Sequence, residues 1–154
     1  MMKKATPSPV PSPIPAVGIV CFDDEGRVLL IKRSKPPRQN EWSIPGGKIE
    51  WGEKAIDAAH RELFEETGIV ADIFGLIDVV DAIFSCRTSG LIHGHYVLID
   101  YVANYTRGTL QAGDDACEVC FVAMDDLDRF NLWPQTRAII DKACVQWCQT
   151  AKLA

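Results

Sequence analysis

The chain has 154 residues, of which 47% are hydrophobic and 24% are charged, and its formal net charge at pH 7 is −5. These values predict one soluble globular domain that is long enough to bury a single substantial core. The acidic balance argues against a general binder of nucleic acid or of membrane surfaces, because such proteins normally present basic surface. We therefore expect neither nucleic acid nor a membrane as a partner.

The beginning of the chain differs in character from the rest. Residues 1–15 carry repeated Pro-Ser-Pro elements, which predict a disordered or polyproline-like arm, with a ligand for a proline-binding partner as the alternative. Residues 16–150 are expected to form the single domain. The sequence has no run of about 18 apolar residues, so no membrane span is expected. The six cysteines are interpreted as reduced thiols, and the protein as cytoplasmic.

Hydrophobic patterning predicts the elements of the first half. Apolar runs at 16–22 and 28–32 flank an Asp/Gly turn and indicate a β-hairpin. A short strand is expected at 42–44 and is ended by Pro45, after which Gly46 and Gly47 would form a tight turn that can approach a ligand or metal. Residues 55–67 predict a helix that Gly68 closes. The expected apolar stripe of this helix consists of Ile56, Ala59 and Leu63.

The second half predicts strands at 70–84, 92–105 and 118–124, a helical turn at 125–127 and a closing amphipathic helix at 135–149. Strands on both sides of the first helix, with another helix at the end, predict an α+β fold built as a mixed layer sandwich. The strand at 92–105 alternates, and one of its faces is expected to carry Tyr96, Leu98, Asp100 and Val102.

Three carboxylates cluster on the first predicted helix. Glu62, Glu65 and Glu66 stand at positions i, i+3 and i+4, which places them on one helix face within an arc of about 100°. Like charges at this spacing repel each other, and near a helix C-terminus they also oppose the helix dipole. Such a cluster can be only a solvated face. If it has a function, a hard divalent cation with oxygen ligands is the simplest candidate.

The wider pattern around these glutamates is more specific. Gly47 is followed after five residues by Glu53 and, after seven more, by Arg61-Glu62-Leu63-x-Glu65-Glu66-x-Gly68-Ile69. This is a complete match to the Nudix box, and the chain therefore resembles the Nudix hydrolase family. The resemblance implies an α/β/α sandwich with a mixed β-sheet, and the cleavage, with Mg²⁺ or Mn²⁺, of a nucleoside diphosphate linked to another moiety.

Three functions stay open within this resemblance. The second half of the chain is most similar to the small ADP-ribose pyrophosphatases, which favours ADP-ribose or a nucleotide sugar as substrate. A nucleoside triphosphate pyrophosphohydrolase, a sanitising enzyme, is the alternative substrate class. A non-catalytic nucleotide-sugar sensor on a Nudix fold is the alternative of another kind, although loss of a metal ligand would be its expected sign. Family analogy also makes a homodimer possible.

The resemblance assigns roles to individual residues. Glu62, Glu65 and Glu66 are the expected metal ligands, joined by Glu53 and the Gly46 carbonyl. Arg61 is expected to orient the glutamates, while Glu62 is either a ligand or the proton acceptor.

Residues outside these positions are assigned from the sequence itself. Glu118 is the leading external base, or else a surface charge at a strand end. Arg33 and Arg38 lie in a basic loop that would contact phosphate or remain solvated. Trp51 would stack on a base or sugar, or else cover the helix start, and Asp114 is expected to bind substrate.

Overall fold

The computed structural model describes residues 11–151, so most of the expected N-terminal arm, residues 1–10, lies outside the described part. The elements, in chain order, are β1 (Ile14–Phe22), β2 (Val28–Arg33), β3 (Trp42–Ser43), β4 (Gly46–Lys48), α1 (Ala55–Thr67), β5 (Ile69–Ser85), β6 (Ile92–Gly108), β7 (Ala116–Val122), the 3₁₀ helix η1 (Met124–Phe130) and α2 (Pro134–Ala151). None of the helices in this described part has the length and apolarity of a membrane span.

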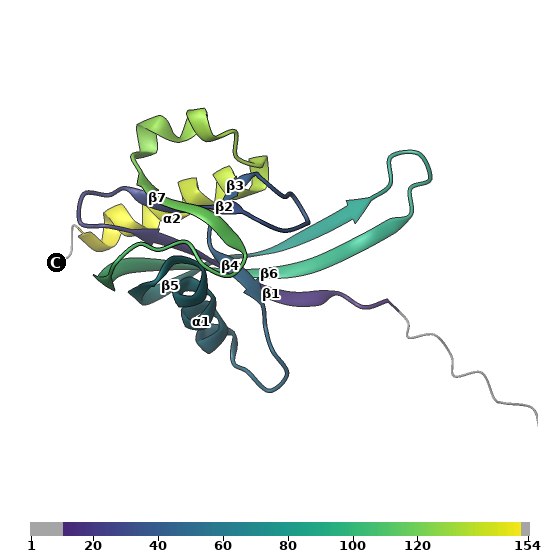
Figure 1. The fold of residues 1–154 in the computed structure, drawn as a ribbon, viewed down its shortest axis with the longest axis horizontal. Helices are drawn as coiled ribbons and strands as arrows, with labels where there is room; N and C mark the ends of the chain where they lie inside the picture. The colour runs from purple at the N-terminus through teal and green to yellow at the C-terminus, as the bar shows by residue number, and fades with distance from the viewer. Residues whose placement is uncertain (1–10, 152–154) are drawn as a thin grey trace, which may run out of the picture.

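The strands form one mixed sheet in the order β3-β2-β1-β6-β5, with β4 paired to β1 and β7 paired to β2. Neighbours β1 and β6 run parallel, whereas β5 and β6 form a long antiparallel pair. Helices α1 and α2 lie on opposite faces of the sheet (Figure 1). The predicted α/β/α sandwich with a mixed β-sheet is therefore confirmed.

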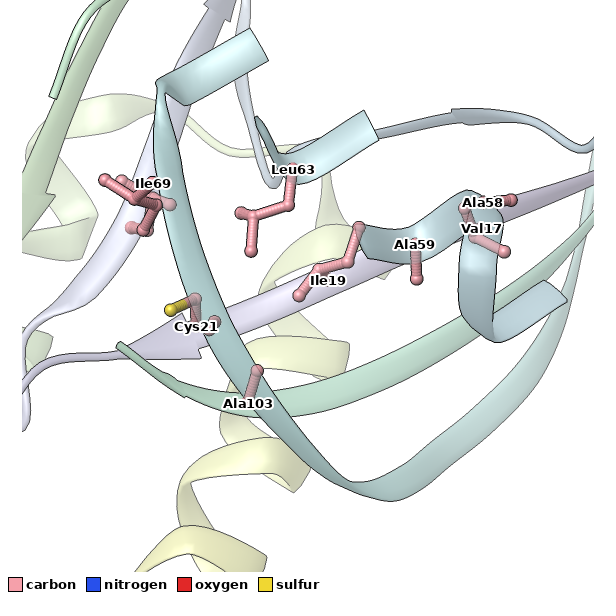
Figure 2. Packing of buried hydrophobic residues seen from close by; sticks show 10 residues of the cluster. Val17, Ile19, Cys21, Ala58, Ala59, Leu63, Ile69 and Ala103 are labelled. Atoms are coloured by element: carbon pink, nitrogen blue, oxygen red, sulfur yellow. The ribbon is translucent and has the colours of Figure 1, made fainter. Parts of the chain in front are cut away.

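Helix α1 covers one face of the sheet through small and branched side chains. Ala58, Ala59 and Leu63 are buried against residues of β1, β5 and β6 such as Ile19, and Figure 2 shows this packing. Burial of a side chain such as leucine contributes about 1.5–3 kcal/mol to folding. The predicted stripe was wrong in one position, because Ile56 is partly exposed and Ala58 takes its place in the core.

Helix α2 covers the other face. Ile139, Ile140 and Ala143 are buried with Val20 and Val102 of the sheet. The predicted alternation of β6 is confirmed, since Val102 packs on the α2 side while Ala103 packs on the α1 side. The two faces of β6 thus contribute to two separate core clusters.

Several element boundaries differ from the sequence prediction, among them that of β1, which begins at Ile14 within the expected arm of residues 1–15. Gly46 and Gly47 do not form a free turn but lie in β4, in register with Gly18 and Val17 of β1. Glycine is needed at residue 46 because a Cβ there would overlap the Val17 carbonyl. Strand β7 begins two residues earlier than expected, at Ala116. Strands β5 and β6 extend beyond the two helices as a ribbon (Figure 1).

Candidate metal and diphosphate site

The C-terminal end of α1 is fixed by the chain around it. Gly68 adopts the left-handed conformation (φ 74°), and its N–H donates to the Phe64 carbonyl over 2.8 Å. Gln111 N–H donates to the Thr67 carbonyl (2.9 Å), and Gly113 N–H donates to the Glu66 carbonyl (3.2 Å). The carbonyls left free by the helix thus receive partners from the loop before β7. This loop brings Asp114 to the glutamates of α1.

Arg61 joins the carboxylates around it. Its guanidinium donates to both oxygens of Glu53 (Nε to Oε1, 2.7 Å; Nη2 to Oε2, 2.9 Å), to Glu62 Oε1 (2.8 Å) and to Glu65 Oε2 (3.1 Å). A further bond reaches the Lys48 carbonyl (3.1 Å). The hydrogen bonds from Arg61 lower the pKa of Glu53 to about 2. The arginine therefore connects the turn before α1 to two carboxylates on the helix.

Glu66 is the most deeply buried member of the cluster. It is 1% exposed, and its Oε2 accepts a 2.9 Å hydrogen bond from the Gly46 N–H. Burial raises the pKa of Glu66 to about 8, with the charge of Glu62 acting in the same direction. Burial also raises the pKa of Glu62, against the opposing effect of Arg61. The surroundings of Glu62 and Glu66 therefore disfavour ionisation of both carboxyls at the same time.

The residues present fit a divalent cation. Carboxylate oxygens of Glu62, Glu65 and Asp114 lie within 4.8 Å of one another, and hard cations such as Mg²⁺ prefer oxygen ligands of this kind. A bound cation would also relieve the electrostatic cost of ionising Glu62 and Glu66 beside each other. Asp114, which the sequence suggested as a substrate contact, thus joins this potential ligand set.

The carboxylates open into a cavity of about 410 Å³. Glu62, Glu66 and Asp114 line one part of it, and Arg33, the last residue of β2, and Arg38 of the loop that follows also line it. The size falls in the usual range for sites that bind small molecules. The cavity therefore combines acidic groups suited to a cation with basic groups suited to phosphate.

The chain matches the family model described as "NUDIX domain" over residues 12–143. The chain belongs to the Nudix hydrolase family. It is 32% identical over 116 residues to an ADP-ribose pyrophosphatase of Methanocaldococcus jannaschii, an alignment that covers 75% of this chain and 66% of that protein. It is 46% identical over 59 residues to an RNA pyrophosphohydrolase of Bartonella tribocorum, with 34% of each chain covered. This chain therefore spans less than two thirds of either relative.

A solved structure of a MutT NUDIX hydrolase from Burkholderia pseudomallei has the same fold. The TM-score is 0.73 at 30% sequence identity, and the comparison covers 86% of this chain and 98% of that one. The Nudix box of the present chain occupies β4, the turn that follows it and α1. The expectation that this box forms a turn leading into a helix agrees with the structure from Trp51 onward.

Glu118 and Trp51 lie outside both the lining of this cavity, called the Nudix cavity below, and the group of carboxylates that Arg61 joins. Glu118 of β7 is in register with Lys32 and forms a 2.7 Å ion pair with it, and neither residue lines the cavity. The Trp51 side chain is fully exposed and also lies outside the cavity lining. The alternative that Trp51 covers the start of α1 was wrong, because a fully exposed ring covers nothing.

Arg33 and Arg38 do line the cavity. Arg33 Nε donates to the Pro37 carbonyl (2.8 Å). Arg38 pairs with Glu41 (2.7 Å) and lies over the Trp133 ring at 4.9 Å from its centroid. The contact with Trp133 joins the loop to the residue before α2, while the other two contacts lie within residues 33–41. The loop is therefore not simply solvated, which was the alternative expected from the sequence.

Sequence reasoning missed three further residues that line the Nudix cavity. Phe84 of β5 stacks on Trp133 with ring centroids 6.2 Å apart, and both rings line the cavity together with Asp100. Asp100 could have been noticed, because it is the one carboxylate on an otherwise apolar face of β6 between residues 96 and 102. No sequence signal brings Phe84 and Trp133 together, since they are 49 positions apart.

Proposed function

We propose that this Nudix protein is a divalent-metal-dependent hydrolase that cleaves the diphosphate of a nucleoside diphosphate linked to another moiety, with ADP-ribose or a nucleotide sugar favoured. One observation carries the proposal: Glu62, Glu66 and Asp114 share a cavity with Arg33 and Arg38. A diphosphate needs both kinds of group, because a cation must offset the acidic side chains before an anionic substrate can bind beside them.

Each residue of the site would have its own role in binding the metal or the substrate. Glu62, Glu65, Glu66 and Asp114 would hold Mg²⁺ or Mn²⁺, which when bound supplies charge neutralisation at the phosphoryl oxygens. Arg61 would fix the orientation of Glu62 and Glu65 through the hydrogen bonds already described. Arg33 and Arg38 would orient the phosphate groups through charge-assisted hydrogen bonds. Glu53 and the Gly46 carbonyl remain expected ligands from the family pattern.

A proton must leave the water that attacks phosphorus, while the bond from phosphorus to the bridging oxygen breaks. Glu62 is the better-placed acceptor, because it lines the cavity and its pKa is raised by burial. Glu118 is less suitable, because its carboxylate is paired with Lys32 outside the cavity lining. A Glu118→Gln variant that keeps the wild-type rate would support this assignment, and one that loses most activity would contradict it.

The choice of substrate rests on the relatives. The similarity to an ADP-ribose pyrophosphatase covers 75% of this chain, whereas the similarity to an RNA pyrophosphohydrolase covers 34% of it. Hydrolysis of a 5′-triphosphate is therefore the second candidate activity. Its substrate would be a 5′-triphosphate RNA or a free nucleoside triphosphate. A non-catalytic sensor is disfavoured because Glu62, Glu65 and Glu66 are all present.

The proposal is tested by incubating the full chain with Mg²⁺ and a panel of ADP-ribose, nucleotide sugars, dinucleoside polyphosphates, nucleoside triphosphates and 5′-triphosphate RNA. We expect ADP-ribose to give AMP and ribose 5-phosphate, with the highest kcat/KM of the panel. The Glu65→Gln variant serves as the inactive control. Preferred release of pyrophosphate from a triphosphate would support the second candidate. Binding without turnover of any substrate would support the sensor.

Location and assembly belong to the same proposal. A cytoplasmic enzyme that acts on small molecules would agree with the acidic surface and the free cysteines. A homodimer would cover exposed apolar residues of β5, among them Leu76, Val79 and Ile83. Sedimentation of the purified chain decides this point, since a monomer at micromolar concentration would remove the dimer from the proposal.

A further inference from the structure

Asp100 is a buried carboxyl without a protein partner. It lies on β6, is 3% exposed and is in register with Gly18 of β1 and Asp78 of β5. Within residues 11–151, none of the hydrogen bonds and ion pairs involves its carboxyl, and neither of its oxygens is a fully enclosed atom without a partner. Burial raises the pKa of Asp100 to about 7, and the charge of Asp78 adds to this shift. A buried polar group of this kind is costly unless something bonds to it.

The carboxyl of Asp100 faces the Nudix cavity and is given room by a glycine. Asp100 is part of the cavity lining, and its Oδ1 lies where a Cβ on Gly18 would otherwise be. Any larger residue at position 18 would displace it. The side chain is therefore held at the floor of the cavity, where a bound molecule can supply the missing hydrogen-bond donor.

The distance from Asp100 to the glutamates restricts what this donor can be. Asp100 is in register with Gly18, and Gly18 is in register with Gly46, whose N–H binds Glu66. Two strand spacings therefore separate the backbones of Asp100 and Gly46, about 10 Å in all. A diphosphate beside Glu66 would thus bring its attached sugar toward Asp100.

The aromatic wall of the cavity lies farther away. Tyr96 is four residues from Asp100 on the same strand, a separation of about 13 Å, and it contacts Phe84, which stacks on Trp133. This wall suits a planar base. The position of Asp100 between the wall and the glutamates suits a sugar.

We propose that Asp100 is a specificity-determining residue that accepts hydrogen bonds from the hydroxyl groups of a ribosyl unit attached to the diphosphate. This inference rests on the proposed function. When ionised, the carboxyl has only acceptors, and two neighbouring sugar hydroxyls offer two donors, which also favour the ionised form. A phosphate group does not suit this position, since the ionised Asp100 carboxyl would repel it. The result is selection for ribose over deoxyribose, because a missing hydroxyl leaves a buried carboxyl unsatisfied.

The test is a thermodynamic cycle that combines substrate analogues with variants of Asp100. The full chain is assayed with ADP-ribose and with its analogues that lack the 2-hydroxyl of either the adenosine ribose or the terminal ribose. For the wild type we expect one analogue to lose about tenfold to a hundredfold in kcat/KM, the effect of a hydrogen bond to a charged group. Asp100→Ala should lose the same factor on ADP-ribose and nothing further on that analogue. Asp100→Asn should lose less.

Two controls keep the outcome informative. Asp72→Asn removes an exposed carboxylate of β5 that is not in the cavity lining, and it should leave the ribose preference unchanged. Binding of ADP-ribose, measured by calorimetry in the Glu65→Gln background, separates recognition from turnover. A preference that is unchanged in Asp100→Ala overturns the inference. A preference that shows in binding while no substrate is cleaved upholds the inference and overturns the proposed function instead.

Discussion

The Gly47 backbone faces the Glu62 carboxylate so closely that a Cβ at residue 47 would overlap Cδ and both oxygens of Glu62. Glycine at this position of β4 therefore determines where a buried carboxylate of α1 can lie. The fit links a strand to the helix that follows it, and it involves a side chain that we place in the metal site.

Gly47→Ala should consequently reduce activity by displacing Glu62. Misplacement of a reacting group by about 1 Å can cost roughly a hundredfold in rate, and we expect a fall in kcat of about that size. Steady-state kinetics with saturating Mg²⁺ measures it. The control is Gly90→Ala, which has a left-handed φ of 70° but open space around its Cβ. It should lower stability by about 1 kcal/mol and leave kcat unchanged. Equal losses of activity in both variants would mean that strain alone is responsible.

Arg61→Gln should destabilise the fold as well as lower activity. Its partners Glu53 and Glu62 are largely shielded from water, with side chains 16% and 11% exposed, and they would keep their charge without a counter-ion. We expect a loss of about 1–3 kcal/mol in the free energy of unfolding, measured by urea denaturation. Arg137→Gln is the matched control, since Arg137 pairs with the exposed residues Asp128 and Asp141. Its cost should stay below about 1 kcal/mol.

Glu66→Gln should abolish activity but make the metal-free protein more stable at high pH. The pKa of Glu66 is raised in the folded state to about 8 from the ordinary value of 4.5 for a glutamate, so the folded state holds its proton more tightly. Its favourable contribution is complete below pH 4.5 and is lost as the pH rises through 8. At pH 8 the variant should gain on the order of 4 kcal/mol over the wild type, and at pH 4 almost nothing.

Chemical denaturation in EDTA at several pH values measures this gain. Asp72→Asn, which removes an exposed carboxylate of β5, should reproduce the wild-type pH dependence. A Glu66→Gln variant that is destabilised equally at both pH values would show that its hydrogen bond with Gly46 matters more than its charge.

Asp114→Asn should weaken the stabilisation that Mg²⁺ gives to the fold. A ligand that binds only the folded state raises the free energy of unfolding according to its concentration and affinity, so the increase in Tm with added Mg²⁺ reports on the metal site. Asparagine tolerates the left-handed backbone at this position (φ 48°). Glu118→Gln should keep the full increase in Tm. The opposite pattern would place the metal near β7 instead.

The sequence predicted the parts of this protein that depend on local chemistry. Helix α1 was expected from its periodicity and from Gly68, and its bounds agree with the prediction. The role of Gly46 and Gly47 was harder to anticipate, because their pairing with β1 depends on residues about 30 positions earlier. Two adjacent glycines after a proline have the sequence signature of a turn when their pairing with β1 is not known.

In the candidate site, too, residues on one local element were predictable and residues brought together by distant contacts were not. The Nudix box identified Glu62, Glu65 and Glu66 because they share one helix. Asp114 reaches them only because Gly113 and Gln111 bond to the end of α1. Glu118 was favoured for its place at a strand start, but pairing of β7 with β2 turns it toward Lys32. The positions of the Asp114 and Glu118 side chains therefore depend on contacts between distant parts of the chain, which local sequence patterns do not reveal.

The parallel pairing of β1 with β6 has a consequence for how the protein folds. Gly18 and Asp100 are adjacent in the sheet but 82 positions apart in the chain, whereas β5 and β6 are joined by a short turn. Contacts between distant residues require costly loop closure, so the β5–β6 hairpin can form early and β1 must join later. The cavity floor contains both Gly18 and Asp100. If Asp100 has the role proposed above, we expect recognition of substrate to be acquired late in folding, after α1 can already be helical.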